Sequence, residues 1–301
     1  MDIRPVDLPE LRADVVEWIN STYAAEMWAS GVDQKLWDWC FGPAGRDQAT
    51  LRALEADRLD SAELYYVSSD MGSLARAAAR SVPGFALQAE DVPSRCGLML
   101  FETPPHVVPF PGAPCGVKAV CWGPMPPNGN GIYGTVYLAR DEAAPHIAKR
   151  TKSRRPWTEP RLIYGFGAEF AWEFGENDGA SPDSDGFLEG LAPALRATWL
   201  LMQQTLARTD ETEPTRASAK RLRRVGREPS PVRVIELRRP AHSGSGDGSR
   251  EFHHQWIVRG HWRQQWYPAR QVHRPVWIAP HIKGPEGAPM IGGEKVYAWK
   301  R

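Results

Sequence analysis

The residues with the greatest potential for chemistry lie in a short segment near the C-terminus. Residues 252–263 read FHHQWIVRGHWR, and five of the eight histidines of the chain fall between positions 253 and 281. In an extended strand, alternate side chains point to opposite faces. The segment therefore predicts a basic face that carries Arg259, His261 and Arg263. The opposite, apolar face would hold Trp256, Val258 and Trp262.

Nucleic-acid binding without catalysis is the function that this composition favours most. Proteins bind single strands through Arg or Lys contacts to phosphates and through stacking of bases on exposed aromatic rings. We therefore predict an interface for RNA or another single strand, because unpaired bases suit stacking and the sequence shows no helix-turn-helix or zinc finger. The predicted nucleic-acid-binding residues are Arg259, Arg263, Trp266, Tyr267, Arg270, Arg274, Trp277 and Lys283.

The histidines support an alternative function, that of a metal-independent endoribonuclease. Imidazole can act as a general acid or base near neutral pH, and Arg or Lys can stabilise the charge that develops around phosphorus. The candidate catalytic residues are His253, His261 and His281. A protein-binding inhibitor or regulator is a further alternative, since Trp and Arg are also favoured at protein interfaces. The sequence leaves open whether the protein is an enzyme.

The tryptophans also have a purely structural interpretation, in which they form the core of a small β module and the charges form its solvated face. No metal site is predicted, because the sequence has no Cys-x-x-Cys pair and its last third has no cysteine. No cofactor is predicted either. A Walker loop, a G-x-G-x-x-G motif after a strand, a G-x-S-x-G motif and a kinase signature are all absent.

Charge is divided unevenly along the chain. Residues 1–215 contain 19 basic and 30 acidic side chains, whereas residues 216–301 contain 18 basic and 6 acidic ones. Such asymmetry points to an anionic partner such as nucleic acid. The alternative is that the acidic and basic parts attract each other, so that the asymmetry is used within the molecule.

The elements that must position these residues show helical and extended periodicities. Apolar spacing predicts helices over residues 9–29, 47–59 and 186–206, and Ser68 is the predicted cap of a helix that ends near residue 80. Strands are predicted at 63–67, 97–101, 117–122, 131–138, 232–237, 252–263, 272–278 and 295–299.

These elements predict an α+β fold with three parts. Residues 1–208 would form an acidic mixed α/β body, and residues 232–301 a small, basic, antiparallel β-rich module or open barrel. Residues 209–231 contain few large apolar side chains, so we predict a basic linker there. In an alternative arrangement the strands of the module pair with the sheet of the body and make one domain.

The predicted location is the cytoplasm, without a membrane partner. The sequence has no run of about 18 apolar residues and no basic, apolar N-terminal signal. Its four cysteines are scattered, as expected for buried thiols in a reducing compartment. No feature of the sequence fixes an oligomeric state.

Two parts of the chain resemble a little-characterised family of proteins from actinobacteria, their phages and their mobile elements. The similarity lies in AELYYVSSDM (62–71) and EDVPS (90–94), and again in VRGHWRQQWYP (258–268) and HRPVWIAPHIKGP (273–285). The order V-R-G-H-x-R, W, P-H-x-K-G is also similar to the tail of phage and plasmid proteins, among them a type V anti-CRISPR protein understood to suppress production of the CRISPR nuclease. The resemblance implies a mobile-element protein that acts on nucleic acid, gene expression or host defence. Carried over residue by residue, it singles out Arg259, Gly260, His261, Arg263, His281 and Lys283.

Overall fold

The structure is a computed structural model that forms two compact units, unit 1 (residues 1–238) and unit 2 (residues 239–301). The residues it describes are 3–31, 48–84, 86–110, 113–125, 129–143, 160–175, 190–238 and 255–284. Unit 1 combines helices with a mixed sheet, and unit 2 contains antiparallel strand pairs, which confirms the predicted α+β class.

Unit 1 begins with helices and continues into a βα pattern. Its first elements are η1 (Pro5–Asp7), α1 (Leu8–Ile19), α2 (Thr22–Gly31), α4 (Gln48–Asp60), β1 (Glu63–Val67), α5 (Ser69–Ala79), η3 (Ala89–Asp91) and β2 (Gly97–Phe101). The remaining elements are β3 (Val107–Phe110), β4 (Ala113–Pro124), β5 (Gly131–Ala139), β6 (Leu162–Glu173), α7 (Leu191–Met202), β7 (Ala207–Thr212), α8 (Arg216–Arg224) and β8 (Val232–Leu237).

Serine caps decide where two of these helices begin. The single helix predicted over residues 9–29 is in fact α1 and α2, because the Ser21 hydroxyl accepts a hydrogen bond from the Ala24 amide (3.1 Å) and starts a new helix. The predicted cap of α5 is confirmed, since Ser68 Oγ accepts from the Met71 amide (3.4 Å). The Glu102 carboxylate also accepts a hydrogen bond from the Ser69 amide (2.6 Å), so the protein supplies its own anion at this helix N-terminus.

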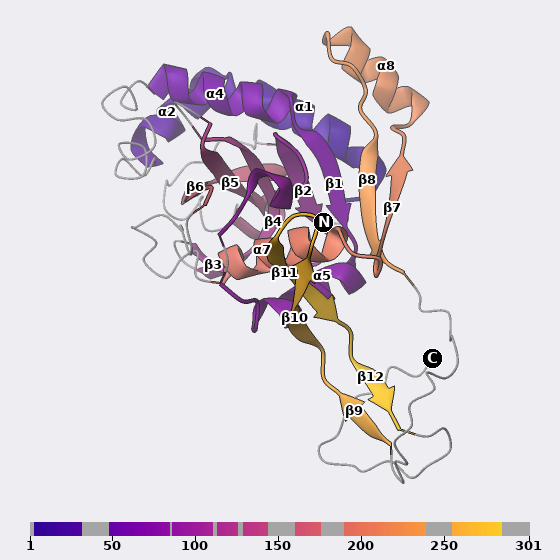
Figure 1. The fold of residues 1–301 in the computed structure, drawn as a ribbon. Helices are drawn as coiled ribbons and strands as arrows, with labels where there is room; N and C mark the ends of the chain where they lie inside the picture. The colour runs from indigo at the N-terminus through magenta and orange to yellow at the C-terminus, as the bar shows by residue number, and fades with distance from the viewer. Residues whose placement is uncertain are drawn as a thin grey trace. The chain divides into compact units, whose positions relative to one another are not determined.

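The sheet of unit 1 has the strand order β6-β5-β4-β2-β1-β8-β7, and β3 pairs with β4. Its centre is parallel, because β1 pairs in parallel with both β2 and β8, and the other pairings are antiparallel. Helices α1, α2 and α4 lie on one face of this sheet, and α5 and α7 lie on the other (Figure 1).

The face covered by α1 and α4 is held by an aliphatic core and by a buried polar network. Leu64 and Tyr66 of β1 pack there with Leu98 and Leu100 of β2, all of them buried. On the same side, the buried Glu55 and Arg58 of α4 form an ion pair, and both side chains also form hydrogen bonds to residues of β5. Arg58 donates to the Tyr133 carbonyl (3.1 Å) and to Thr135 Oγ1 (3.1 Å), and Glu55 accepts from Thr135 (2.8 Å) and from the Tyr137 hydroxyl.

The opposite face contains a chain of aromatic contacts. Tyr65 stacks on Trp122 with a centroid separation of 5.8 Å, and Trp122 contacts Trp199 of α7 at 5.3 Å. Trp199 in turn lies edge-on to Trp172 at 5.8 Å. Gly97 makes room for this packing, since a Cβ atom there would lie 2.2 Å from the Trp122 ring. Trp122, Trp172 and Trp199 are thus buried between the sheet and α7.

The predicted boundaries within the C-terminal half need correction. Residues 209–231 were predicted as a linker, but they include most of β7 and all of α8, and β8 pairs with β1 in the unit 1 sheet. The contact boundary falls after Arg238. Backbone hydrogen bonds hold β7 to β8, and Thr215 caps α8 by accepting from the Ser218 amide (3.2 Å), so neither element needs the apolar stripe that the prediction looked for.

Unit 2 forms a β-ribbon made of two ladders. Its strands are β9 (Trp256–Val258), β10 (His261–Tyr267), β11 (Val272–Ile278) and β12 (His281–Lys283). β10 pairs with β11, and β9 pairs with β12, both antiparallel. The prediction of a single strand over 252–263 is corrected by a break at Arg259 and Gly260, which face a matching break at Ala279 and Pro280. Proline has no amide hydrogen for the ladder, so the ribbon is interrupted at this level.

Among the described residues, no helix is long and apolar enough to cross a membrane. Three of the four cysteines are described, and Cys96, Cys115 and Cys121 are all free thiols. Cys40 and the predicted strand at 295–299 lie outside the described residues.

Candidate nucleic-acid interface

The hairpin formed by β10 and β11 carries most of the predicted binding residues. Its two strands are joined by a four-residue turn, Pro268 to Gln271, in which the Arg270 amide donates to the Tyr267 carbonyl (3.1 Å). Gln271 has the positive φ of 53° that closes the turn, and its side-chain amide donates to the Pro268 carbonyl (3.0 Å). The turn fixes which residues stand opposite each other on the two strands.

One face of the hairpin is aromatic. Trp262 stands opposite Trp277, and Trp266 stands opposite His273. The Trp262 and Trp277 rings meet edge-on at 5.2 Å, and the Trp266 and His273 rings meet at 4.8 Å. The two pairs differ in exposure, because Trp277 is 6 % exposed whereas Trp266 is 39 % exposed. One pair forms a small core, and the other leaves an aromatic surface next to the turn.

The packing of Trp277 explains why it does not belong to the binding surface that the sequence predicted. A Cβ atom at Gly260 would lie 2.4 Å from the Trp277 ring, so the indole lies against the backbone at the break between β9 and β10. This close approach requires glycine at position 260. With its ring enclosed by Trp262 and Gly260, Trp277 has no face left on which a base could stack.

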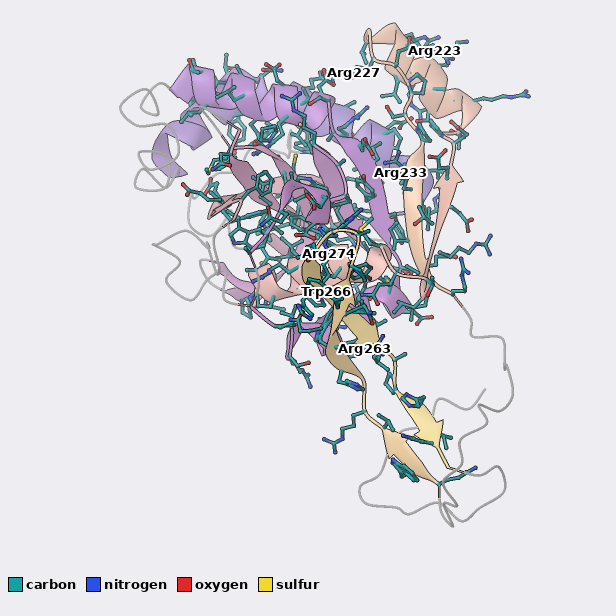
Figure 2. The ribbon with its side chains drawn as sticks, in the orientation of Figure 1. Arg223, Arg227, Arg233, Arg263, Trp266 and Arg274 are labelled. Carbon is teal, nitrogen blue, oxygen red and sulfur yellow. The ribbon has the colours of Figure 1, made fainter. Side chains whose placement is uncertain are left out.

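The other face of the hairpin is basic. His261, Arg263, Gln265 and Tyr267 alternate along β10, and Gln265 stands opposite Arg274 of β11. Arg263 donates to Gln265 Oε1 (2.7 Å), a neutral acceptor that leaves the guanidinium charge uncompensated. Tyr267 is 39 % exposed at the end of this row. Arg263, Trp266 and Arg274 are labelled on the hairpin in Figure 2.

The second ladder holds the rest of the predicted set. Lys283 lies over the Trp256 ring at 6.0 Å, on strands that pair these two residues directly. Trp256 is half-buried, and Val258, two positions along the same strand, is half-buried as well. Arg259 lies at the break and not on a strand, so the row of Arg259, His261 and Arg263 on one strand face is interrupted.

Of the three candidate catalytic histidines, the structure describes His261 and His281, and it does not bring these two together. His261 and His281 are both exposed, and the Nδ1 atom of each lies near the backbone carbonyl two residues earlier, at 3.0 Å from Arg259 O and 3.1 Å from Ala279 O. His261 lies three positions beyond Val258, the residue opposite His281, which separates the two by about 10 Å along the ribbon. His253 lies outside the described residues.

Charge pairing differs between the basic segments. In unit 1, Arg221 bonds Glu10 (3.0 Å), Arg227 pairs with Asp60, and Arg233 pairs with Glu63. Part of the positive charge of residues 216–301 is therefore compensated by carboxylates of residues 1–215. Arg263 and Arg270 of the hairpin, by contrast, form no ion pair within the part of the chain that the structure describes.

Within the described ranges, no group of three or more His, Cys, Asp or Glu side chains is arranged so that it could hold a metal ion.

Comparison with known proteins gives a distant structural match. No protein-family model and no curated protein matches the chain. Among solved structures, the crystal structure of AcrVA2, an anti-CRISPR protein, aligns with 83 % of this chain and 83 % of its own, at 14 % identity and a TM-score of 0.36. These values are too low to establish a shared fold or function. The similarity to actinobacterial mobile-element proteins stays a prediction.

Proposed function

We propose that the protein binds nucleic acid, preferentially RNA or another single strand, through the hairpin of β10 and β11. The observation that carries the proposal is the exposure of Trp266 and Tyr267 next to the turn, each at 39 %, beside a face that carries Arg263 and Arg274. Tyr267 shares this basic face, whereas Trp266 lies on the opposite, aromatic face, so each face of the hairpin ends at the turn in an exposed ring.

Each part of this surface matches one chemical feature of a single strand. An exposed indole or phenol ring offers a π face on which a base can stack, a contact worth about 1–3 kcal/mol per base. The Arg263 guanidinium donates to the neutral amide oxygen of Gln265 and forms no ion pair with any described residue, so it can donate to phosphate oxygens. Stacking requires bases that are not already paired, which favours single strands over duplex.

Substitution of Trp266 is the most direct test, because one variant can remove the aromatic ring and another can retain an aromatic ring. We expect Trp266→Ala to weaken binding of a labelled single-stranded RNA about 5- to 100-fold, the equivalent of one lost stacking contact. Trp266→Phe should restore most of the affinity, since it keeps an aromatic face. Fluorescence anisotropy at fixed salt measures both variants.

The control is Val107→Ala, which truncates another exposed apolar side chain, in unit 1. It should bind as the wild type does. If the wild-type protein binds neither RNA nor single-stranded DNA, and carries no nucleic acid when purified at low salt, the proposal is wrong and a protein partner becomes the better explanation for this surface.

A further inference from the structure

Helix α8 has two sides with different roles. Its inner side is fixed to the rest of unit 1, because Ser218 and Leu222 are buried and α8 contacts α1. Arg221 strengthens this attachment by donating from Nε to Glu10 of α1 (3.0 Å), and Arg227, just beyond the helix, pairs with Asp60. These contacts account for the two basic residues that face the body of unit 1.

The outer side of α8 is basic and nearly unpaired. At 3.6 residues per turn, the side chains opposite Ser218 and Leu222 fall within an arc of about 100°. These outer residues are Arg216, Lys220, Arg223 and Arg224, and all four are exposed. Within the described ranges, Arg216, Lys220 and Arg224 form no ion pair. Arg223 has one long contact of 3.9 Å to Glu228, and both side chains are well exposed (64 % and 88 %). Figure 2 labels Arg223 and Arg227 on and beyond this helix.

This arrangement is unfavourable for the helix itself. Like charges four residues apart, as at Arg216, Lys220 and Arg224, repel each other and destabilise a helix. Arg216 also occupies the first helical position, where the helix dipole disfavours a cation. Surfaces that serve only solubility usually mix both signs of charge, but α8 has no acidic residue in its nine positions. An anionic partner would convert this repulsion into attraction.

We propose that the outer face of α8, formed by Arg216, Lys220, Arg223 and Arg224, is a second nucleic-acid contact that binds the phosphate backbone without regard to sequence. This inference rests on the proposed function, since it assumes that the protein binds nucleic acid. The face extends about 12 Å from Arg216 to Arg224 and presents only cationic side chains, which suits a linear array of phosphates.

Two other anionic partners fit the face less well. A helix that binds a membrane surface needs an apolar side to insert between lipids, but the apolar side of α8 is buried against unit 1. A protein interface is centred on aromatic or apolar anchors, and the outer face of α8 has none. Phosphate contacts need neither, because they position a nucleic acid and do not read its bases.

The test compares two variants with the same change in net charge. The first is Arg216→Gln/Lys220→Gln/Arg224→Gln. The matched control is Arg76→Gln/Arg80→Gln/Arg95→Gln, which neutralises three exposed basic residues elsewhere in unit 1. Binding of a labelled single-stranded RNA of about 30 nucleotides is measured by anisotropy between about 50 and 300 mM NaCl, and thermal melting checks that both variants fold. Should the triple variant not fold, Lys220→Gln with Arg80→Gln as its control replaces the pair.

We expect the α8 triple variant to flatten the log–log salt dependence by about 2, because each phosphate contact contributes about 0.7 on a single strand. At about 100 mM salt, this corresponds to a loss of affinity on the order of 100-fold if the affinities converge near 1 M. The control variant should lower the slope by less than about 0.5, and Lys220→Gln alone should lower it by about 0.7.

The outcomes separate this inference from the proposed function. If Trp266→Ala weakens RNA binding but the α8 variant matches its control, the inference is overturned and the hairpin proposal stands. If the α8 variant loses affinity while Trp266→Ala does not, the inference stands and the hairpin proposal fails. If the wild type binds vesicles containing phosphatidylserine, but no nucleic acid, and the α8 variant abolishes that binding, both proposals are wrong.

Discussion

The interior of unit 1 and the hairpin of unit 2 use the same residue types in opposite ways. In unit 1, Trp122 is fully buried between the sheet and α7, and Arg58 is buried beside the carboxylate of Glu55. In the hairpin, Trp266 is 39 % exposed and Arg263 donates to a neutral acceptor, the side-chain amide of Gln265. Tryptophan and arginine are therefore informative about function only when their surroundings are known.

The two regions also differ in the energetic cost of their arginine charges. A buried charge costs several kcal/mol unless it is paired and hydrogen-bonded, and Arg58 meets that condition through Glu55, Thr135 and the Tyr133 carbonyl. Arg263 is exposed to water and meets no such demand. We therefore expect that Arg263 can be replaced without loss of the fold, so that its contribution to binding can be measured separately from stability.

Replacement of a tryptophan in each region should give the largest contrast. We expect Trp122→Ala to lower the free energy of unfolding by about 3–5 kcal/mol, because it opens a cavity under Tyr65 and Trp199. Trp266→Ala should change the free energy of unfolding by less than about 0.5 kcal/mol. Urea titration followed by circular dichroism measures both. Equal losses in the two variants would mean that the Trp266 ring is part of a core.

The next largest difference in stability is expected when the carboxylate is removed from a buried ion pair and, separately, from an exposed one. Glu55→Gln leaves the buried Arg58 guanidinium without a carboxylate, which should cost about 3–5 kcal/mol of unfolding free energy. Glu10→Gln removes the acidic partner of Arg221, whose side chain is 60 % exposed, and should cost about 0–1 kcal/mol. Chemical denaturation of the two variants side by side provides the measurement. A stability close to wild type for Glu55→Gln would show that Arg58 has access to water.

The smallest change to the protein is the alkylation of single thiols, and here we expect Cys96 and Cys121 to differ in reactivity. Burial raises the pKa of Cys121 to about 11, so at pH 8 only about 0.1 % of this thiol is ionised. Cys96 is partly exposed. We expect iodoacetamide to modify Cys96 within minutes at pH 8 and to leave Cys121 intact in the folded protein, with peptide mapping by mass spectrometry as the readout. In denaturant both should react at similar rates. Fast modification of folded Cys121 would indicate that the sheet opens there.

Local sequence patterns predicted the core of unit 1 well. The strand predicted at 63–67 is β1, and the predicted cap Ser68 begins α5, because short-range periodicity and capping are encoded within a few residues. The helix predicted over 186–206 corresponds to α7, Leu191–Met202. Elements that depend on distant partners were missed. Strand β7 consists mostly of charged and polar residues and is held by backbone hydrogen bonds to β8, which no side-chain pattern reveals.

The candidate site shows the same limit. The sequence predicted that Arg263 and His261 share a face, and the structure places both on the basic face of β10. It could not separate Trp277 from Trp266, because exposure depends on the hairpin register and on the absence of a side chain at Gly260. The basic residues of α8 were visible in the sequence, but they were assigned to a linker and not to one face of a helix, although the cap residue Thr215 and the spacing of Ser218 and Leu222 indicate a helix.

The pairing of β1 with β8 has a consequence for the protein during its synthesis. Because about 160 residues separate these strands, the ribosome needs roughly 10–30 s to make β8 after β1 has been made. During that time β1, whose last four residues are buried in the finished fold, is an apolar edge on a growing chain. Once β8 and β7 have been added, the edge on this side of the sheet is instead β7, which is rich in charged side chains and resists edge-to-edge association. A nascent chain stalled before residue 232 would therefore be a substrate for chaperones.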